Sequence, residues 1–212
     1  MSMKGFTTYF SFANERREQT KLRGFTLVEA LVAVTIITLS VAGPLFTANR
    51  AIVAAQNTRL QLTASYLAQE GVEYVRAMRD DAYLARYRQG GTNVSGDAWN
   101  EFLNGSIPAS IPQQCRTGTC TLDTALSMGN SLSPCSGNTC LPLRLTQLSN
   151  GTSGYTQQSD GTPTPFTRTI QLVNISGTGD LYPDKRLVST VSWDFHGTRY
   201  SVVINDHLTP WQ

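Results

Sequence analysis

One stretch of this sequence constrains the fold more than any other: the run from Phe25 to Ala48, in which Glu29 carries the only charge. At a rise of about 1.5 Å per residue, a helix of this length spans about 36 Å, which is enough to cross a hydrocarbon core of about 30 Å. The run is therefore predicted to be a single membrane span.

The residues before this run set its orientation. Residues 1–24 form a basic leader, and the rest of the chain is close to neutral; the basic residues of the leader are Lys4, Arg16, Arg17, Lys21 and Arg23. Basic flanks stay in the cytoplasm, so we expect a single-pass protein of the inner (cytoplasmic) membrane whose C-terminal region is extracytoplasmic. Because the neutral remainder has no basic stripe, nucleic acid is disfavoured as the main ligand.

The change from polar to apolar sequence falls at one junction. An ordinary secretory signal is cut after its apolar region, whereas here the apolar region starts directly behind Arg23-Gly24. The residues Gly24-Phe25-Thr26-Leu27-Val28-Glu29 resemble the processing motif of type IV prepilins and of the pseudopilins of type II secretion. The resemblance implies that a prepilin peptidase cuts between Gly24 and Phe25 and methylates the new N-terminus. It also implies partners: this peptidase/N-methylase, other pilin or pseudopilin subunits, and the membrane.

Glu29 needs an explanation, because an acidic side chain in hydrocarbon costs about 2.5–3.5 kcal/mol. The resemblance supplies one: cleavage creates a cationic amine on Phe25, and Glu29 of an adjacent subunit pairs with it during assembly. The alternative is that Glu29 merely snorkels at the edge of the span.

The helix is predicted to continue beyond the span, from Thr26 to Tyr87, over about 93 Å. No proline follows Pro44 in this stretch, and Gln89-Gly90-Gly91 supplies a stop. Apolar residues recur every seven positions at Val53, Leu60, Leu67 and Tyr74, and others lie near one stripe at Ala64, Gly71, Val75 and Met78. We interpret residues 25–48 as the membrane or filament-core half and 49–89 as an amphipathic half that packs on a core; a dimerising coiled coil is the alternative for this stripe. Gly43 and Pro44 predict a kink or a melted turn.

The C-terminal part has the composition of a sheet domain. Residues 90–165 form a variable, loop-rich region, with one short helix expected at 97–103 that starts from Ser95 or Asp97. Strands are predicted at Phe166–Ile175, Arg186–Phe195 and Thr198–Asn205, with His196-Gly197 as the hairpin turn. An antiparallel sheet over 166–212 against the long helix gives an α+β fold.

Two cysteine modules of equal spacing lie in the loop-rich region: Cys115 with Cys120, and Cys135 with Cys140. In an oxidising compartment they predict two disulfides, and of the three connectivities we favour pairing within each module. The alternative is a four-thiolate zinc site.

Two classes of function follow. The first is a structural subunit, a minor pilin-like component of a type IV pilus or related filament, or else a pseudopilin of a type II secretion or DNA-uptake system. The second is a membrane-tethered adhesive or binding ectodomain. His196 and His207 are too few for a catalytic constellation, and no phosphate-binding or nucleophile motif occurs, so we expect no enzyme, no cofactor and no metal site.

Overall fold

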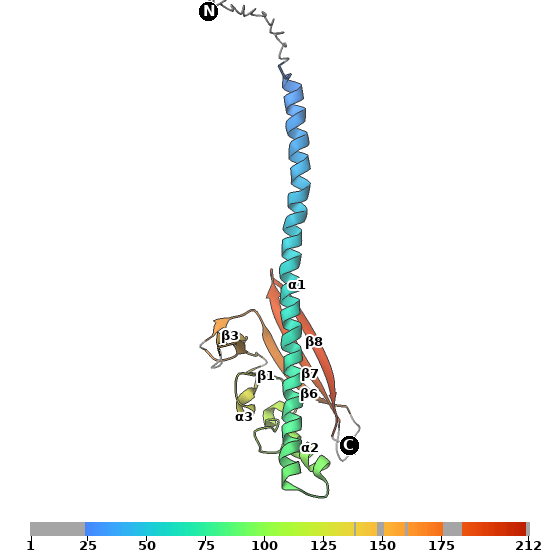
Figure 1. Ribbon diagram of the computed structural model, residues 1–212, viewed down its shortest axis with the longest axis vertical. Helices are drawn as coiled ribbons and strands as arrows, with labels where there is room; N and C mark the ends of the chain where they lie inside the picture. Colours follow the sequence, from blue (N-terminus) through green and yellow to red (C-terminus); the bar gives the residue numbers. More distant parts are fainter. Residues whose placement is uncertain (1–23, 138, 148–150, 160, 176–183, 211–212) are drawn as a thin grey trace, which may run out of the picture. The chain divides into compact units, whose positions relative to one another are not determined.

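The computed structural model describes residues 24–137, 139–147, 151–159, 161–175 and 184–210 (Figure 1). The chain divides into two compact units, Met1–Arg50 and Ala51–Gln212. Residues 1–23 of the basic leader lie outside the described residues, and so does Trp211.

The long helix α1 covers Leu27–Gln89 and belongs to both units. The chain leaves it through Gly90 and Gly91, whose φ angles of 74° and 147° lie where glycine is favoured. The backbone stays helical through Gly43 and Pro44, so the turn expected to melt there is intact. A bend at these two residues stays a prediction.

The described residues of the second unit form two antiparallel sheets. The larger has the order β2-β1-β6-β7-β8, and the smaller has the order β4-β3-β5. Their bounds are β1 Cys120–Leu122, β2 Leu132–Pro134, β3 Arg144–Gln147, β4 Ser153–Thr156, β5 Thr162–Pro163, β6 Thr167–Asn174, β7 Lys185–Phe195 and β8 Thr198–Leu208. The remaining helices are α2 Val94–Asn104, the 3-10 turn η1 Gln113–Cys115, and α3 Met128–Ser131. The α+β prediction is confirmed.

The three long strands form near their predicted bounds, except that β8 continues past the predicted end at Asn205 to Leu208, and β7 and β8 are joined by the expected turn. His196 and Gly197 have φ angles of 52° and 78°, which is the backbone of a two-residue hairpin turn with two positive φ angles. Pairing then runs without a bulge from Phe195 and Thr198 to Lys185 and Leu208. The sheet also includes β1 and β2, which come from the loop-rich region, because Cys120 of β1 pairs with Ile170 of β6.

Helix α2 begins earlier than expected. Asn93, not Ser95 or Asp97, caps it: the Asn93 side chain accepts a hydrogen bond of 3.3 Å from the backbone N–H of Gly96. A cap of this kind satisfies an N–H group of the first turn, so the helix starts at Val94.

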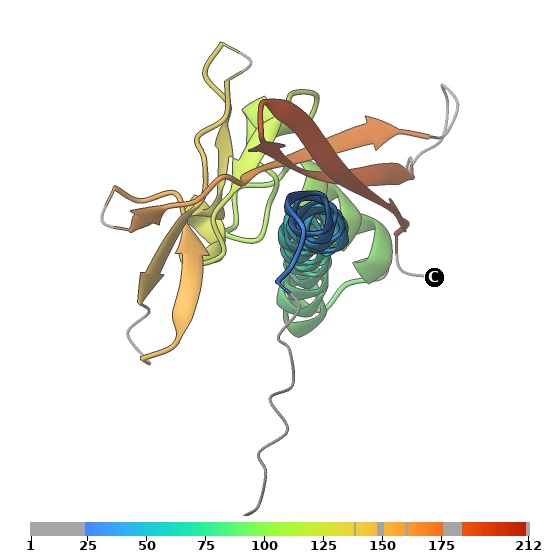
Figure 2. The ribbon, with the colours of Figure 1, turned by 90° about the horizontal axis from the view of Figure 1, so that it is seen from above.

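One face of α1 packs on the larger sheet, and Figure 2, which looks down the helix, shows β7 and β8 along one side of it. The buried residues of α1 are Ala64, Leu67, Ala68, Gly71, Val72, Val75, Met78 and Ala82. All of them except Gly71 belong to one of two apolar clusters, one with Trp99 and Phe102 of α2 and one with Phe166 and Trp193. Leu60 and Tyr74 contact these clusters, whereas Val53, the first residue of the seven-residue repeat, is exposed.

A charged side chain also lies inside this core. Arg168 of β6 is fully buried and donates hydrogen bonds to the Leu122 carbonyl (2.8 Å) and the Leu67 carbonyl (3.2 Å). Its guanidinium forms an ion pair of 2.6 Å with Glu70. These contacts connect α1 to both β1 and β6. Each of them gives a buried N–H group of Arg168 a hydrogen-bond partner, and such a group left unpaired in the core would lower the stability of the fold.

Candidate functional site

The junction at which the sequence predicts cleavage lies just before α1. Gly24, Phe25 and Thr26 are not helical, and Phe25 is 78% exposed. No described atom lies within 4 Å of the position that a Cβ on Gly24 would take. Packing within the described chain therefore does not require glycine here.

Thr26 caps the helix that follows. Its Oγ1 accepts a hydrogen bond of 3.2 Å from the backbone N–H of Glu29, and its carbonyl accepts one of 3.1 Å from Ala30. Thr26 and Glu29 have the spacing of a capping box, and an acid in the first turn also stabilises the positive end of the helix dipole. Our sequence reasoning missed this role, although the Thr-x-x-Glu pattern before an apolar run was the available signal.

The Glu29 carboxylate differs from four hydroxyl groups in the apolar half of α1. Thr35, Thr38, Ser40 and Thr47 each donate their hydroxyl to a carbonyl one turn earlier, at 2.7 to 2.9 Å. Such bonds satisfy hydroxyl groups inside a bilayer. Among the described residues, no side chain forms a hydrogen bond or ion pair with the Glu29 carboxylate.

In the described part of the first unit, residues 24–50, the large apolar side chains are exposed. α1 is the one helix, among the residues described, that is long and apolar enough to cross a membrane, and none of its apolar window is buried. The exposed large apolar residues between Gly24 and Arg50 are Phe25, Leu27, Val28, Leu31, Val32, Val34, Ile36, Ile37, Leu39, Val41, Leu45 and Phe46. Arg50, whose guanidinium carbon lies 4.7 Å from the centre of the Phe46 ring, is the first charge after Glu29. An apolar surface of this extent requires lipid or other helices around it.

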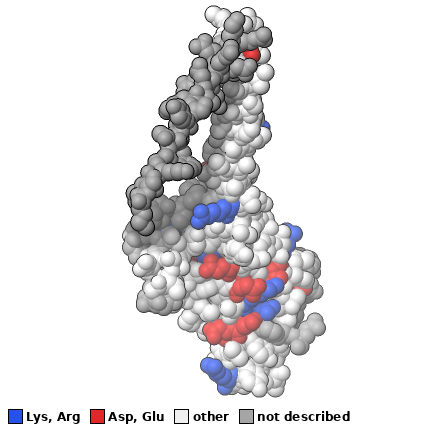
Figure 3. All heavy atoms as spheres, turned by 45° about the horizontal axis from the view of Figure 1, so that its top comes forward, with Lys and Arg blue, Asp and Glu red and all other residues white. Residues whose placement is uncertain are grey.

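The second unit carries its charges differently. In Figure 3, acidic and basic side chains lie next to one another on one face of it. Arg76 is an example. Its guanidinium forms an ion pair of 2.8 Å with Glu73 and donates hydrogen bonds of 2.7 Å to both carboxylate oxygens of Asp206. The hydrogen bond from Arg76 lowers the pKa of Asp206 below its ordinary value.

The cysteines pair within their modules. Cys115 forms a disulfide with Cys120 and Cys135 with Cys140, with Cα–Cα distances of 5.6 and 4.6 Å. The first is buried in the cluster that contains Trp99, and the second is partly exposed. Because all four sulfurs are used in disulfides, the chain offers no thiolate to zinc.

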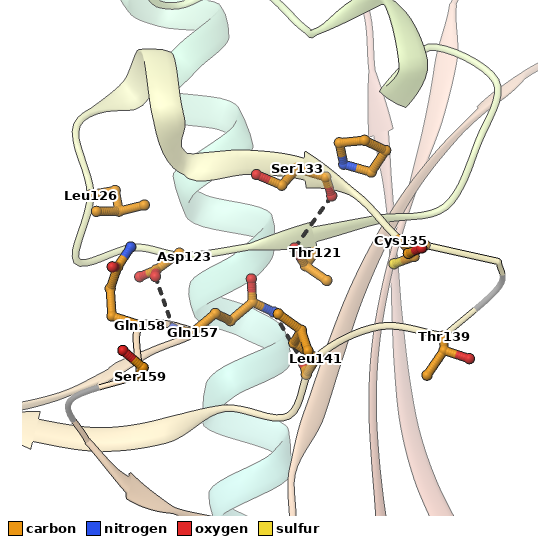
Figure 4. Close-up of a pocket in the computed structure, with 12 residues that line it drawn as sticks. Thr121, Asp123, Leu126, Ser133, Cys135, Thr139, Leu141, Gln157, Gln158 and Ser159 are labelled. Atoms are coloured by element: carbon orange, nitrogen blue, oxygen red, sulfur yellow. Dashed lines mark hydrogen bonds between the residues drawn. The ribbon is translucent and has the colours of Figure 1, made fainter.

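A pocket of about 400 Å³ lies beside Cys135 (Figure 4). Asp123 supplies the one carboxylate that lines this pocket. That carboxylate already accepts hydrogen bonds of 2.8 Å from the Thr156 hydroxyl and the Gln157 backbone N–H. The residues that line the pocket include no histidine, lysine or arginine. The pocket therefore presents no pair of a nucleophile and a base.

The two histidines are also engaged locally. His196 lies in the β7–β8 turn with its ring 4.3 Å from that of Phe195, and His207 Nε2 lies 3.0 Å from Asp184 Oδ2. Neither forms part of a catalytic arrangement among the residues that the structure describes.

Comparison with known proteins gives one match. Residues 20–43 match the family model described as the prokaryotic N-terminal methylation motif. No curated protein and no solved structure matches the chain. The matched segment includes the Gly24–Phe25 junction, the capped helix start and Glu29. The chain thus carries, at the head of its exposed apolar helix, the signature of type IV pilins and pseudopilins.

Proposed function

We propose that the chain is a minor pilin-like subunit of a type IV pilus or related filament. It is inserted in the inner membrane as a prepilin, cut after Gly24, methylated on Phe25, and assembled through α1. The observation that carries this proposal is the methylation motif placed at the start of a helix whose large apolar residues from Leu27 to Phe46 are exposed. Such a helix is stable in a bilayer and, after extraction, only against other apolar helices.

Glu29 has two tasks in this proposal. Within its own chain it occupies the first turn of α1, where Thr26 accepts the Glu29 N–H. Between chains, its carboxylate binds the cationic amine of Phe25 on the neighbouring subunit, and each charge offsets the burial cost of the other.

In this proposal, each segment of the chain has its own role. Residues 1–24 are the cytoplasmic leader, 25–48 the membrane and filament-core half of α1, and 49–89 the half that carries the extracytoplasmic domain. Within that domain, residues 90–165 are the variable region with the cysteine modules and 166–212 the C-terminal sheet. The two disulfides support this orientation, because disulfides persist in oxidising compartments outside the cytoplasm.

Maturation tests the proposal directly. The full chain is produced together with a prepilin peptidase, extracted from the membrane, and its N-terminus is read by mass spectrometry. We expect methylated Phe25 in the wild type and an uncut chain in Gly24→Val, because a bulky side chain obstructs a peptidase that must approach the backbone closely. Gly43→Val is the matched control: its site in α1 is equally open, and maturation should be normal. A wild-type chain that keeps Met1, or is cut elsewhere, contradicts the proposal.

The place of assembly separates a pilus from a secretion or DNA-uptake pseudopilus. Filaments sheared from the cell surface should contain the mature chain if it belongs to a pilus. Recovery only with the cell envelope would instead favour the pseudopilin. A membrane-tethered adhesive ectodomain requires no cleavage, so it predicts the uncut chain.

A further inference from the structure

Two hollows meet at the C-terminal end of α2, within the second unit. The larger has a volume of about 730 Å³ and a mostly polar lining, and the smaller has a volume of about 30 Å³. Asn104, Ile111 and Arg116 line both, so the two hollows form one continuous cleft, which we call the Arg116 cleft. The smaller hollow is completed by Leu103, Leu172 and Lys185. The larger hollow has the size of a site for a small molecule.

The wall of the Arg116 cleft is held in place by the chain itself. The Ile111 backbone N–H donates a hydrogen bond of 2.7 Å to the Phe102 carbonyl, which fastens the loop after α2 to that helix. Cys115, the residue directly before Arg116, is buried and bound to Cys120 by a disulfide. The cleft is therefore formed before any ligand enters it, as is usual for small-molecule sites.

The half-buried guanidinium of Arg116 has unused hydrogen-bond donors. Its Nε donates a hydrogen bond of 3.3 Å to the Ile111 carbonyl, and no other described residue bonds its two terminal nitrogens. A planar guanidinium that is held at one nitrogen presents the remaining N–H groups in a fixed fork, and this fork matches the oxygens of a carboxylate or a phosphate.

Lys185 adds a second cation to the smaller hollow, from the start of β7. Its Nζ donates a hydrogen bond to the side-chain oxygen of Asn174, which uses one of the three N–H donors of the ammonium group. Partial burial lowers the pKa of Lys185, because the charged ammonium loses part of its water. No carboxylate of the described chain bonds this ammonium, so a bound anion would offset the cost of its burial.

The lining of the cleft supplies no negative charge to these two cations. Among the described residues that line either hollow, none is an aspartate or a glutamate. Two arginines elsewhere in the second unit differ in this respect, since Arg76 is paired with Asp206 and Arg168 with Glu70. Cations that line one cleft without an acid concentrate anions from solution.

We propose that the Arg116 cleft binds a small hydrophilic anion, whose carboxylate or phosphate group lies in the smaller hollow against Arg116 and Lys185. A hollow of about 30 Å³ has room for one or two water-sized groups, which suits the oxygens of such an anion and excludes a ring. The body of the ligand occupies the larger hollow, where side chains such as Ser106 and Gln113 favour hydroxyl or amide groups. This site goes beyond the proposed function, because binding here requires neither cleavage after Gly24 nor assembly.

Binding is tested on the full chain in detergent, by calorimetry and by NMR of the backbone and arginine side-chain N–H groups. The probes are inorganic phosphate, glucuronate and glucose, the last being an uncharged counterpart of glucuronate. Chloride keeps the ionic strength constant, because salt screens exposed charges. We expect phosphate, glucuronate or both to saturate a single site with a dissociation constant of about 10 mM or lower, and glucose not to bind. Tighter binding of phosphate identifies the ligand group as a phosphate, and tighter binding of glucuronate identifies it as a carboxylate.

Three variants with the same loss of charge locate the site. Arg116→Gln and Lys185→Gln should each weaken binding by about tenfold or more, because each removes a charge-assisted hydrogen bond. Arg186→Gln is the matched control: Arg186 is the exposed neighbour of Lys185 and does not line the cleft, so this variant should bind as tightly as the wild type. Urea unfolding shows whether each variant is folded, and if one is not, the other and the NMR shifts of the wild type still decide.

Three outcomes overturn the proposal. Equal weakening in all three variants means that the anion responds to the overall charge of the chain and not to the cleft. Binding of glucose as tight as that of glucuronate means that the cleft does not recognise a negative charge. The third is a wild-type spectrum in which no probe shifts the Arg116 side-chain or the Lys185 backbone signal.

Discussion

The two disulfides form a natural pair of variants, because they have the same sequence separation and different surroundings. Closing a loop of about six residues restricts the unfolded chain by about 2 kcal/mol in either module. Cys115 and Cys120 are 3% and 1% exposed, so replacing them with alanine also removes two packed sulfur atoms from the core. Each of these costs about 1 kcal/mol, by analogy with a buried methylene group.

We therefore expect Cys115→Ala/Cys120→Ala to lower the free energy of unfolding by about 4 kcal/mol, and Cys135→Ala/Cys140→Ala by about 2 kcal/mol. The assay is urea unfolding of the full chain in detergent, followed by tryptophan fluorescence. Trp99 is a suitable probe, since it lies in the same apolar cluster as Cys115. Limited reduction of the wild type, with free thiols counted by mass, should open the partly exposed Cys135–Cys140 bond first.

An equal decrease in the free energy of unfolding of the two double variants would refute this reasoning. It would mean that loop closure alone sets how much each disulfide contributes to stability. A larger loss in the Cys135–Cys140 variant would refute it more strongly. Four free thiols in the untreated protein would reject the disulfides themselves.

Three further predictions concern other parts of the chain. Glu29→Ala should insert in the membrane at least as well as the wild type but be depleted from sheared filaments, whereas Glu29→Asp should be recovered there; normal abundance of Glu29→Ala refutes the pairing role. Gly71→Val should destabilise the second unit by about 1–3 kcal/mol in the same urea assay, because even a Cβ at this position would lie 2.7 Å from Ser189 Oγ; unchanged stability refutes the close approach. Since the pKa of Asp206 is lowered by Arg76, their pairing contributes fully above the unfolded pKa of about 4 and is lost as the pH falls through the lowered value. Asp206→Asn should therefore lose less stability than the wild type between neutral pH and about pH 3 in acid titrations, and equal losses would contradict this.

Several features were readable from the sequence because each depends on nearby residues alone. The apolar run, the Gly24–Phe25 junction and the stop at Gly90 need only composition and local backbone preferences. The β7–β8 hairpin is local in the same sense, since two β-favouring runs flank a two-residue turn at His196. The start of α2 was also local, but the expected cap was wrong because Asn93 competes with Ser95 and Asp97 for that position.

Other features were decided only by the tertiary structure. β1 and β2 have three residues each, too few to show an alternating pattern, and they become strands because β6 offers an edge to pair with. Arg168 is a charge at an inward position of β6, and its partners Leu122 and Glu70 are 46 and 98 residues away in the sequence. The place of β8 at one end of the larger sheet likewise depends on how strands distant in the sequence pair. Local preference fixes where helices and long strands form, whereas burial, distant pairing and free edges arise only when the chain has folded, because they are properties of neighbours in space and not in sequence.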